Sequence, residues 1–166
     1  MLGTTSTNTM KIKTFLILIF FLLLPQMTGA IGAYFTLPAI ASWYQFINKP
    51  AWAPPNWLFG PAWTTLYFLM GMASFLIWQK RKDPKAKKAL TIYLLHLPLN
   101  SLWSILFFGL RSPLWAFIEI MVLWGAILYL TISFFKIKKV SGWLFLPYLL
   151  WTSFASALNL AIVLLN

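Results

Sequence analysis

The chain alternates long apolar runs with short polar or aromatic segments. Five runs are long enough to cross a bilayer, at about residues 12–35, 61–79, 89–109, 113–135 and 142–165. A membrane-crossing helix needs about 20 mostly apolar residues. In lipid, such a run satisfies its backbone polar groups only as a helix. The pattern therefore predicts an all-α fold, a five-transmembrane-helix bundle, with residues 1–11 as an N-terminal extension and 12–166 as one membrane domain.

Composition supports an integral membrane protein. Of the 166 residues, 61% are hydrophobic and only 9% are charged, whereas soluble domains carry about 25% charged residues. There is no cysteine, so neither a disulfide framework nor thiolate chemistry is available. Five spans with short loops leave no room for a separate soluble domain.

The net charge of +11 is explained by where the basic residues fall. With five spans, the N-terminus and the second and fourth loops share one side of the membrane, and that side holds 11 of the 13 Lys and Arg residues. The positive-inside rule places this side in the cytoplasm and the C-terminus on the opposite side. Basic loops next to a bilayer meet anionic headgroups, so no nucleic-acid partner is expected.

The first apolar run has two interpretations. Lys11, Lys13, the run at 15–24 and the small residues Thr28-Gly29-Ala30 are also typical of a cleavable signal peptide. The apolar character continues to Phe35, however, and removing the segment would leave the bundle without one wall, so we expect a helix. Gly29 and Ala33 form a small-xxx-small pair, and a stretch from Ala86 onward is another candidate for the contact face of a homodimer.

The segment between the first two spans is unusually rich in tryptophan and proline. Residues 43–63 read WYQFINKPAWAPPNWLFGPAW and contain four tryptophans and four prolines. Proline fixes the backbone and removes an amide donor, so this segment is not expected to be a helix or a central strand. We expect a rigid, aromatic loop that caps a cavity in the bundle, on the side opposite the basic loops.

Aromatic and amide side chains recur inside the spans at helical spacing. Such rows are Trp63 and Tyr67 in the second span, Asn100, Trp103 and Phe107 in the third, and Pro147, Trp151, Ala155 and Asn159 in the fifth. A few polar groups among aromatic walls are typical of a small-molecule site. Tryptophans near span ends fit the interfacial aromatic belt instead; these are Trp57, Trp78, Trp115 and Trp143.

Two ionisable residues lie inside the predicted spans. His96 could be an axial haem ligand or a hydrogen-bonded packing residue. Glu119 could have a function within the membrane or be a hydrogen-bonded structural residue near the interface. With one histidine and two acids in the chain, we expect no metal site and no conventional catalytic set.

Three stretches carry a family resemblance. WYQFINKPAWAPPNWLFGPAWTTLYFLMGMA at 43–73, LNSLWSILFFG at 99–109 and LPYLLWTSFASALNLAIVLLN at 146–166 resemble the TspO/MBR family in order and spacing. The resemblance extends from about Gly29 to the C-terminus. It implies a five-helix bundle, commonly dimeric, that binds tetrapyrroles such as protoporphyrin IX, and also other flat aromatic ligands. No cofactor is required, and the chain lacks the longer basic tail that animal members carry, so sterol is not an expected ligand.

The resemblance also implies a set of ligand-binding residues. By position they are Trp43, Tyr44, Trp52, Trp63, Tyr67, Asn100, Trp103, Trp151 and Ala155. Some bacterial members promote light-dependent oxidative degradation of protoporphyrin, and Trp63 and Trp151 match the tryptophans implicated there. Three hypotheses follow: a membrane protein that regulates or carries tetrapyrroles, a photo-oxidative enzyme that uses these two indoles, or a membrane scaffold or signalling protein with an incidental pocket. The propionates of a porphyrin would need donors such as Lys49, Asn100 or the indoles of the loop.

Overall fold

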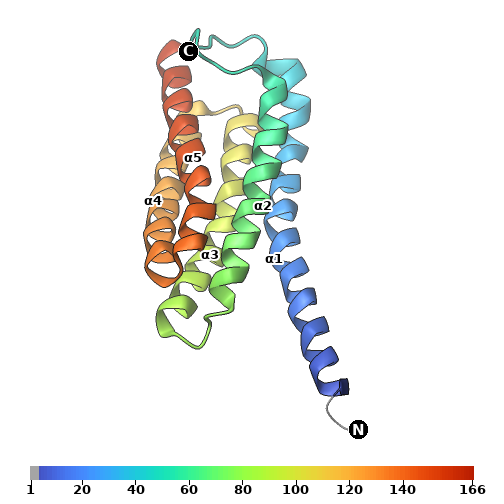
Figure 1. Ribbon diagram of the computed structural model, residues 1–166. Coiled ribbons are helices and arrows are strands. Elements are labelled where there is room, and N and C mark those ends of the chain that lie inside the picture. The colour runs from blue at the N-terminus through green and yellow to red at the C-terminus, as the bar shows by residue number, and fades with distance from the viewer. Residues whose placement is uncertain (1–3) are drawn as a thin grey trace.

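The computed structural model describes residues 4–166, which form five long helices that run along a common direction (Figure 1). All five are long and apolar enough to cross a membrane. The predicted all-α bundle of five membrane-spanning helices is therefore confirmed, and no strand occurs between residues 4 and 166. The helices are α1 (Thr4–Ala39), α2 (Phe59–Trp78), α3 (Pro84–Ser104), α4 (Pro113–Ile137) and α5 (Lys139–Leu165).

Helices α1 and α3 begin furthest ahead of their apolar runs. Helix α3 starts at Pro84, because Asp83 caps it by accepting a 2.8 Å hydrogen bond from the Lys85 amide, and Pro84 occupies the first turn. The lysines at 85–88 are therefore helical. Helix α1 starts at Thr4, so the described part of the predicted N-terminal extension continues the first helix.

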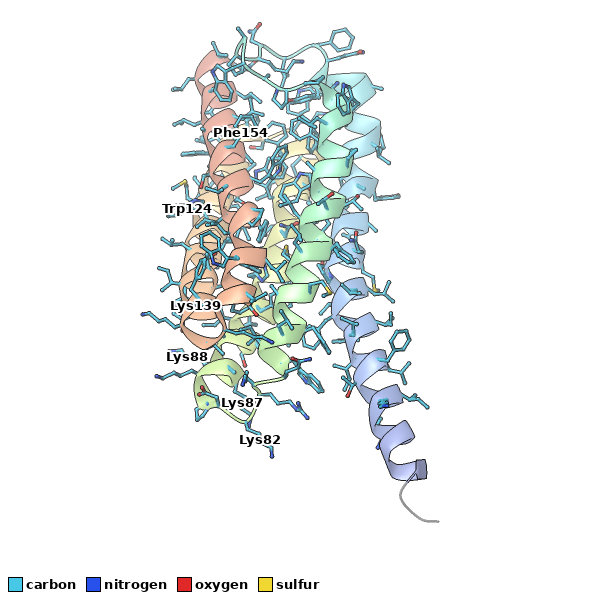
Figure 2. All side chains as sticks on the ribbon, viewed as in Figure 1. Lys82, Lys87, Lys88, Trp124, Lys139 and Phe154 are labelled. Carbon is cyan, nitrogen blue, oxygen red and sulfur yellow. The ribbon has the colours of Figure 1, made fainter. Side chains whose placement is uncertain are left out.

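Basic residues gather at the end of the bundle where α2 turns into α3 and α4 turns into α5. Figure 2 places Lys82, Lys87, Lys88 and Lys139 at this end, which we call the basic end. The C-terminus and the loop between α1 and α2 lie at the opposite end, which we call the cap end (Figure 1). The bundle thus separates the charge as the sequence predicted, while the side of the membrane that each end faces stays a prediction.

The basic half of the bundle has a dense aromatic and aliphatic core. Phe145 is fully buried and its ring lies 4.9 Å from that of Phe134, 5.5 Å from Tyr148 and 6.4 Å from Tyr93. Interiors of this kind are close-packed, so a change of one methylene is felt. This core joins α3, α4 and α5.

Helices α1 and α2 meet at glycines. A Cβ on Gly71 would lie 2.5 Å from the carbonyl oxygen of Phe21, so only glycine allows this approach. Pro25, inside α1, has no amide hydrogen with which to bond that carbonyl. A Cβ on Gly29 would lie 2.2 Å from the Tyr67 ring. Toward its N-terminus α1 departs from the other helices (Figure 1).

The tryptophan- and proline-rich segment is helical at both ends, so the prediction that it is not helical was wrong there. Trp43 and Tyr44 complete a π-helical turn, η1 (Ile40–Tyr44), and a 3₁₀ turn, η2 (Asn56–Leu58), leads into α2. Pro61 lies in the first turn of α2, where the amide that proline lacks would have no intrahelical partner anyway. Only residues 45–55 are irregular, and a second π-helical turn, η3 (Ile105–Gly109), ends α3.

Candidate ligand cavity

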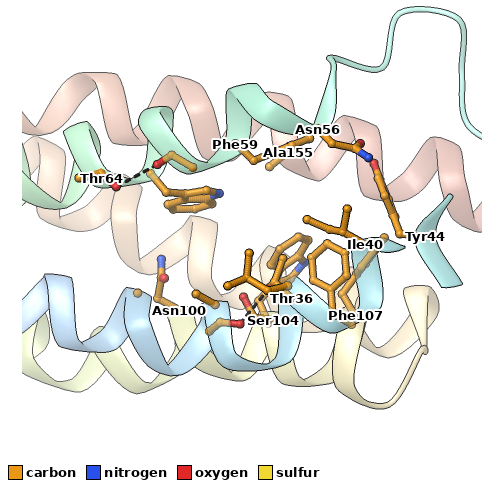
Figure 3. A pocket seen from close by; sticks show the side chains of 18 of the residues that line it. Thr36, Ile40, Tyr44, Asn56, Phe59, Thr64, Asn100, Ser104, Phe107 and Ala155 are labelled. Atoms are coloured by element: carbon orange, nitrogen blue, oxygen red, sulfur yellow. Dashed lines mark hydrogen bonds between the residues drawn. The ribbon is translucent and has the colours of Figure 1, made fainter. Parts of the chain in front are cut away.

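The cap half of the bundle encloses a cavity of about 540 Å³. Its walls come from α1, α2, α3 and α5 and from both π-helical turns, as Figure 3 shows from close by. Sites for drug-sized ligands are roughly 300–1,000 Å³ and mostly apolar with a few placed polar groups. The cavity therefore has the size and character of a small-molecule site.

Paired aromatic rings form much of the wall. Trp63 stacks on Tyr67 with ring centroids 5.5 Å apart, and Trp103 stacks on Phe107 at 5.1 Å. Trp151 meets the edge of Phe59 at 6.1 Å. All six rings line the cavity. Flat aromatic surfaces attract other flat rings through offset-stacked and edge-to-face contacts, so this wall suits a flat aromatic guest.

The floor of the cavity is a buried hydrogen-bonded chain across three helices. The hydroxyl of Tyr67 donates to Oδ1 of Asn100 at 2.6 Å, and Nδ2 of Asn100 donates to the hydroxyl of Tyr148 at 2.7 Å. The three residues come from α2, α3 and α5. Asn100 therefore helps to hold the floor in place, and its predicted role as a donor to a propionate stays a prediction.

Trp103 is held in position by a second polar chain. Its Nε1 donates to Oδ1 of Asn159 at 3.0 Å, and Nδ2 of Asn159 donates to the carbonyl of Pro113 at 2.8 Å. These bonds join α3, α5 and the start of α4. The indole of Trp103 thus presents a fixed ring to the cavity, whereas Nε1 of Trp151 is buried without a hydrogen-bond partner.

Small residues form the α1 wall. Gly29, Ala30, Gly32, Ala33 and Thr36 line the cavity on this side. A Cβ on Gly32 would lie 2.9 Å from Oγ of Ser104, so α1 packs closely on the end of α3 there. Gly29 lies against Tyr67 within the same chain, and Ala86 is fully buried. Gly29 and Ala86 themselves thus make contacts within the chain, while the predicted homodimer faces stay predictions.

The cavity brings together seven of the nine site residues that the sequence singled out. They are Tyr44, Trp63, Tyr67, Asn100, Trp103, Trp151 and Ala155. Trp43 and Trp52 do not line it: Trp43 packs on Phe107 at 5.7 Å, and Trp52 is half exposed and packs on Phe154 at 5.7 Å. Lys49 donates to the carbonyl of Tyr44 at 2.6 Å, so it fastens the loop. Their roles in binding stay predictions.

Sequence reasoning did not identify the α1 wall or several lining residues of other elements. Among those others are Asn56, Phe59, Ser104, Phe108 and Ile162. Small apolar residues in a membrane helix look the same whether they face lipid or a cavity. The one usable signal was the pair of Gly29 and Ala33, which we interpreted as a helix-contact motif.

The two ionisable residues of the spans lie outside the cavity wall. Nδ1 of the buried His96 contacts the carbonyl of Tyr93, and its ring packs beside Tyr93, Phe145 and Tyr148. This arrangement favours the packing interpretation over the haem-ligand one. Glu119 is buried, and neither carboxyl oxygen has a hydrogen-bond partner. Within residues 4–166, no three His, Cys, Asp or Glu side chains come together as metal ligands would.

Fold and cavity together define a multi-pass α-helical membrane protein with an aromatic small-molecule pocket under an aromatic loop. A family model described as TspO/MBR matches residues 21–165. The chain therefore belongs to the TspO/MBR family.

Individual relatives agree with this assignment. The chain is 46% identical to the tryptophan-rich protein TspO of Archaeoglobus fulgidus, over 83% of this chain and 89% of that protein. It is 38% identical to the tryptophan-rich sensory protein of Cereibacter sphaeroides, over 83% and 87%. It is also 35% identical to the human translocator protein, over 84% and 83% of the two chains. Similarity thus covers most of the chain in archaeal, bacterial and animal relatives.

Proposed function

We propose that the protein binds tetrapyrroles such as protoporphyrin IX within the membrane and regulates or carries them. The observation that supports this most is the cavity of about 540 Å³ with Trp63, Trp103 and Trp151 in its walls. A porphyrin is flat and apolar over its faces, so stacked indoles complement it. The family resemblance points to the same ligand class.

The test is a titration of the purified protein, in lipid nanodiscs and in the dark, with protoporphyrin IX. Saturable quenching of tryptophan fluorescence is expected. Trp151→Ala should weaken binding about two- to tenfold, since an aromatic pair contributes about 0.5–1.5 kcal/mol beyond buried area. Trp143→Ala is the matched control, because Trp143 lies on the same helix, is 64% exposed and is remote from the cavity lining. Unsaturable quenching, or an equal loss in the control, would contradict the proposal.

A second candidate is light-dependent oxidative degradation of the bound porphyrin. Trp63 and Trp151 line one cavity, which would hold two oxidisable indoles against the same guest. Under illumination in air, the protein should then form a defined product over several turnovers, and the double variant Trp63→Phe, Trp151→Phe should form none. Bleaching no faster than that of protoporphyrin in detergent alone would exclude degradation and leave binding intact.

The proposed topology has the basic end in the cytoplasm and the cap end and C-terminus on the opposite side. Because the natural chain has no cysteine, the side of the membrane that each end faces can be determined by labelling single introduced cysteines. A cysteine at Lys82 should react with an impermeant maleimide only after the cells are opened, and one at Ala51 before. We also expect a homodimer, which mass measurement of the protein in nanodiscs would test.

A further inference from the structure

The cavity reaches the outer surface of the bundle between α1 and the first two turns of α2. Six residues line the cavity and are exposed at the same time: Ala30, Leu37, Asn56, Trp57, Gly60 and Thr64. Figure 3 shows the two helices on opposite sides of the cavity, with Asn56 and Thr64 on one side and Thr36 and Ile40 on the other. We call this opening the α1–α2 slot.

The middle of the slot is open because the side chains that face each other there are short. On α2, a Cβ added to Gly60 would meet no atom within 4 Å. One turn further, Oγ1 of Thr64 donates to the carbonyl of Gly60 at 2.9 Å, so this hydroxyl bonds to its own helix. On α1, Ala30 and Ala33 face the cavity. No long side chain from these four positions bridges the two helices.

The slot has a firm lower boundary. Nε2 of Gln26 donates to the carbonyl of Thr64 at 3.1 Å and ties α1 to α2. Just below, Gly29 packs on the ring of Tyr67, and further toward the basic end Gly71 packs on the backbone at Phe21. The two helices are therefore in close contact below the slot and separate above it.

The composition of the slot edges suits hydrocarbon better than water. Its edges lie within two membrane-spanning segments, Lys11–Tyr44 and Asn56–Trp78. Its exposed edge residues are Ala, Leu, Asn, Trp, Gly and Thr, with no charged side chain among them, and the amide, Asn56, precedes α2 at the end of the slot nearest the loop. The Thr64 hydroxyl is already bonded within α2. Apart from Asn56, this edge is mostly apolar, so it is compatible with lipid chains and with an apolar solute dissolved among them.

We propose that ligands reach the cavity laterally, from the half of the bilayer on the cap side, through the α1–α2 slot. This inference rests on the proposed function, since it concerns how the flat apolar guest of that site arrives. The guest would pass edge-on between Gly60 and Ala33 and then turn its faces to the indoles. On this route the guest does not pass through the loop of residues 45–55, none of which lines the cavity.

The proposal can be tested with a substitution that narrows the slot and leaves the aromatic residues of the cavity wall unchanged. Gly60→Phe places a ring in open space, and Ala51→Phe puts the same ring on the exposed loop, outside the cavity lining. Association and dissociation of protoporphyrin IX are followed by ligand fluorescence in nanodiscs. Gly60→Phe should slow both association and dissociation at least tenfold, whereas a mere loss of binding contacts would speed dissociation. Ala51→Phe should match the wild type.

The opposite pattern would overturn the proposal: wild-type rates in Gly60→Phe, or slower rates in Ala51→Phe alone. If Gly60→Phe does not fold, Gly60→Cys can be reconstituted first and then modified with a bulky maleimide, because no other cysteine reacts. The same slowing is expected, and unchanged rates in fully modified protein would count against the slot. Saturable binding with unchanged rates contradicts only the slot, whereas absence of saturable binding in the wild type contradicts the proposed function.

Discussion

The two halves of the bundle contain the same residue types, but one half is a filled core and the other encloses a cavity. In the basic half, aromatic rings contact one another, as Phe134, Phe145 and Tyr148 do, and fill the space between helices. In the cap half, Trp63 and Trp103 each stack on one neighbour and leave about 540 Å³ unfilled. The comparison teaches that aromatic content alone does not distinguish a core from a site. The difference lies in the small residues opposite the rings, which either let the helices pack closely or leave space between them.

Glycine illustrates the same contrast. In the basic half, Gly71 and Gly142 leave no room for a Cβ, which would lie 2.5 Å from Phe21 and 2.3 Å from Phe135. At the cap end, a Cβ on Gly60 would meet nothing within 4 Å. The first two glycines allow contact between elements, and the third maintains an opening. Stability should therefore depend mainly on the basic half, and ligand binding on the cap half.

The largest effect is expected from Phe145→Ala, which empties the centre of the basic half. The free energy of unfolding should fall by about 3–5 kcal/mol, as for Phe→Ala in other cores. The thermal midpoint of the purified protein measures this, with Trp143→Ala as the exposed control on the same helix. The basic half would not be the stabilising half if Phe145→Ala left the midpoint unchanged.

A smaller loss is expected from overfilling the same half. Ala73 is fully buried on α2 among Met70 and Ile77, so Ala73→Leu should destabilise the protein by about 1–3 kcal/mol. Ala155→Leu adds the same atoms at the cavity and should have little effect on the thermal midpoint. Equal losses in the two variants would show that the cavity is filled in the functional protein.

The smallest effect is expected at the boundary between the halves. Asn100→Leu removes the acceptor of the Tyr67 hydroxyl and the donor to Tyr148. Hydrogen bonds between membrane helices contribute about 0.6 kcal/mol each on average and up to about 1.7, so a loss of about 1–2 kcal/mol is expected. Tyr67→Phe, which removes one bond, should cost about half as much. A stabilised Asn100→Leu would mean that the chain of bonds is not formed in the bilayer.

Much of the fold and part of the site could be predicted from the sequence. The five spans follow from hydropathy, because lipid leaves a continuous apolar run only one structure. The rows that contain Trp63, Asn100 and Trp151 follow from helical spacing, because residues four apart share a face.

The remaining features depend on packing that spacing cannot reveal. Trp52 and Trp63 belong to the same segment, yet only Trp63 lines the cavity, because Trp63 is already inside α2. The π-helical turns that bring Tyr44 and Phe107 to the cavity have no signature in the sequence. The α1 wall consists mostly of residues too small to stand out in an apolar run.

The central claim is that the cap half is a hollow built for a flat aromatic guest. The most direct test is a protoporphyrin IX titration of Ala155→Trp, followed by ligand fluorescence in nanodiscs together with the thermal midpoint. Ala155 lines the cavity beside Trp151, so a tryptophan there should occupy the space of the guest. The account predicts that saturable binding is lost while the thermal midpoint is retained. Binding with wild-type affinity in this folded variant would contradict it.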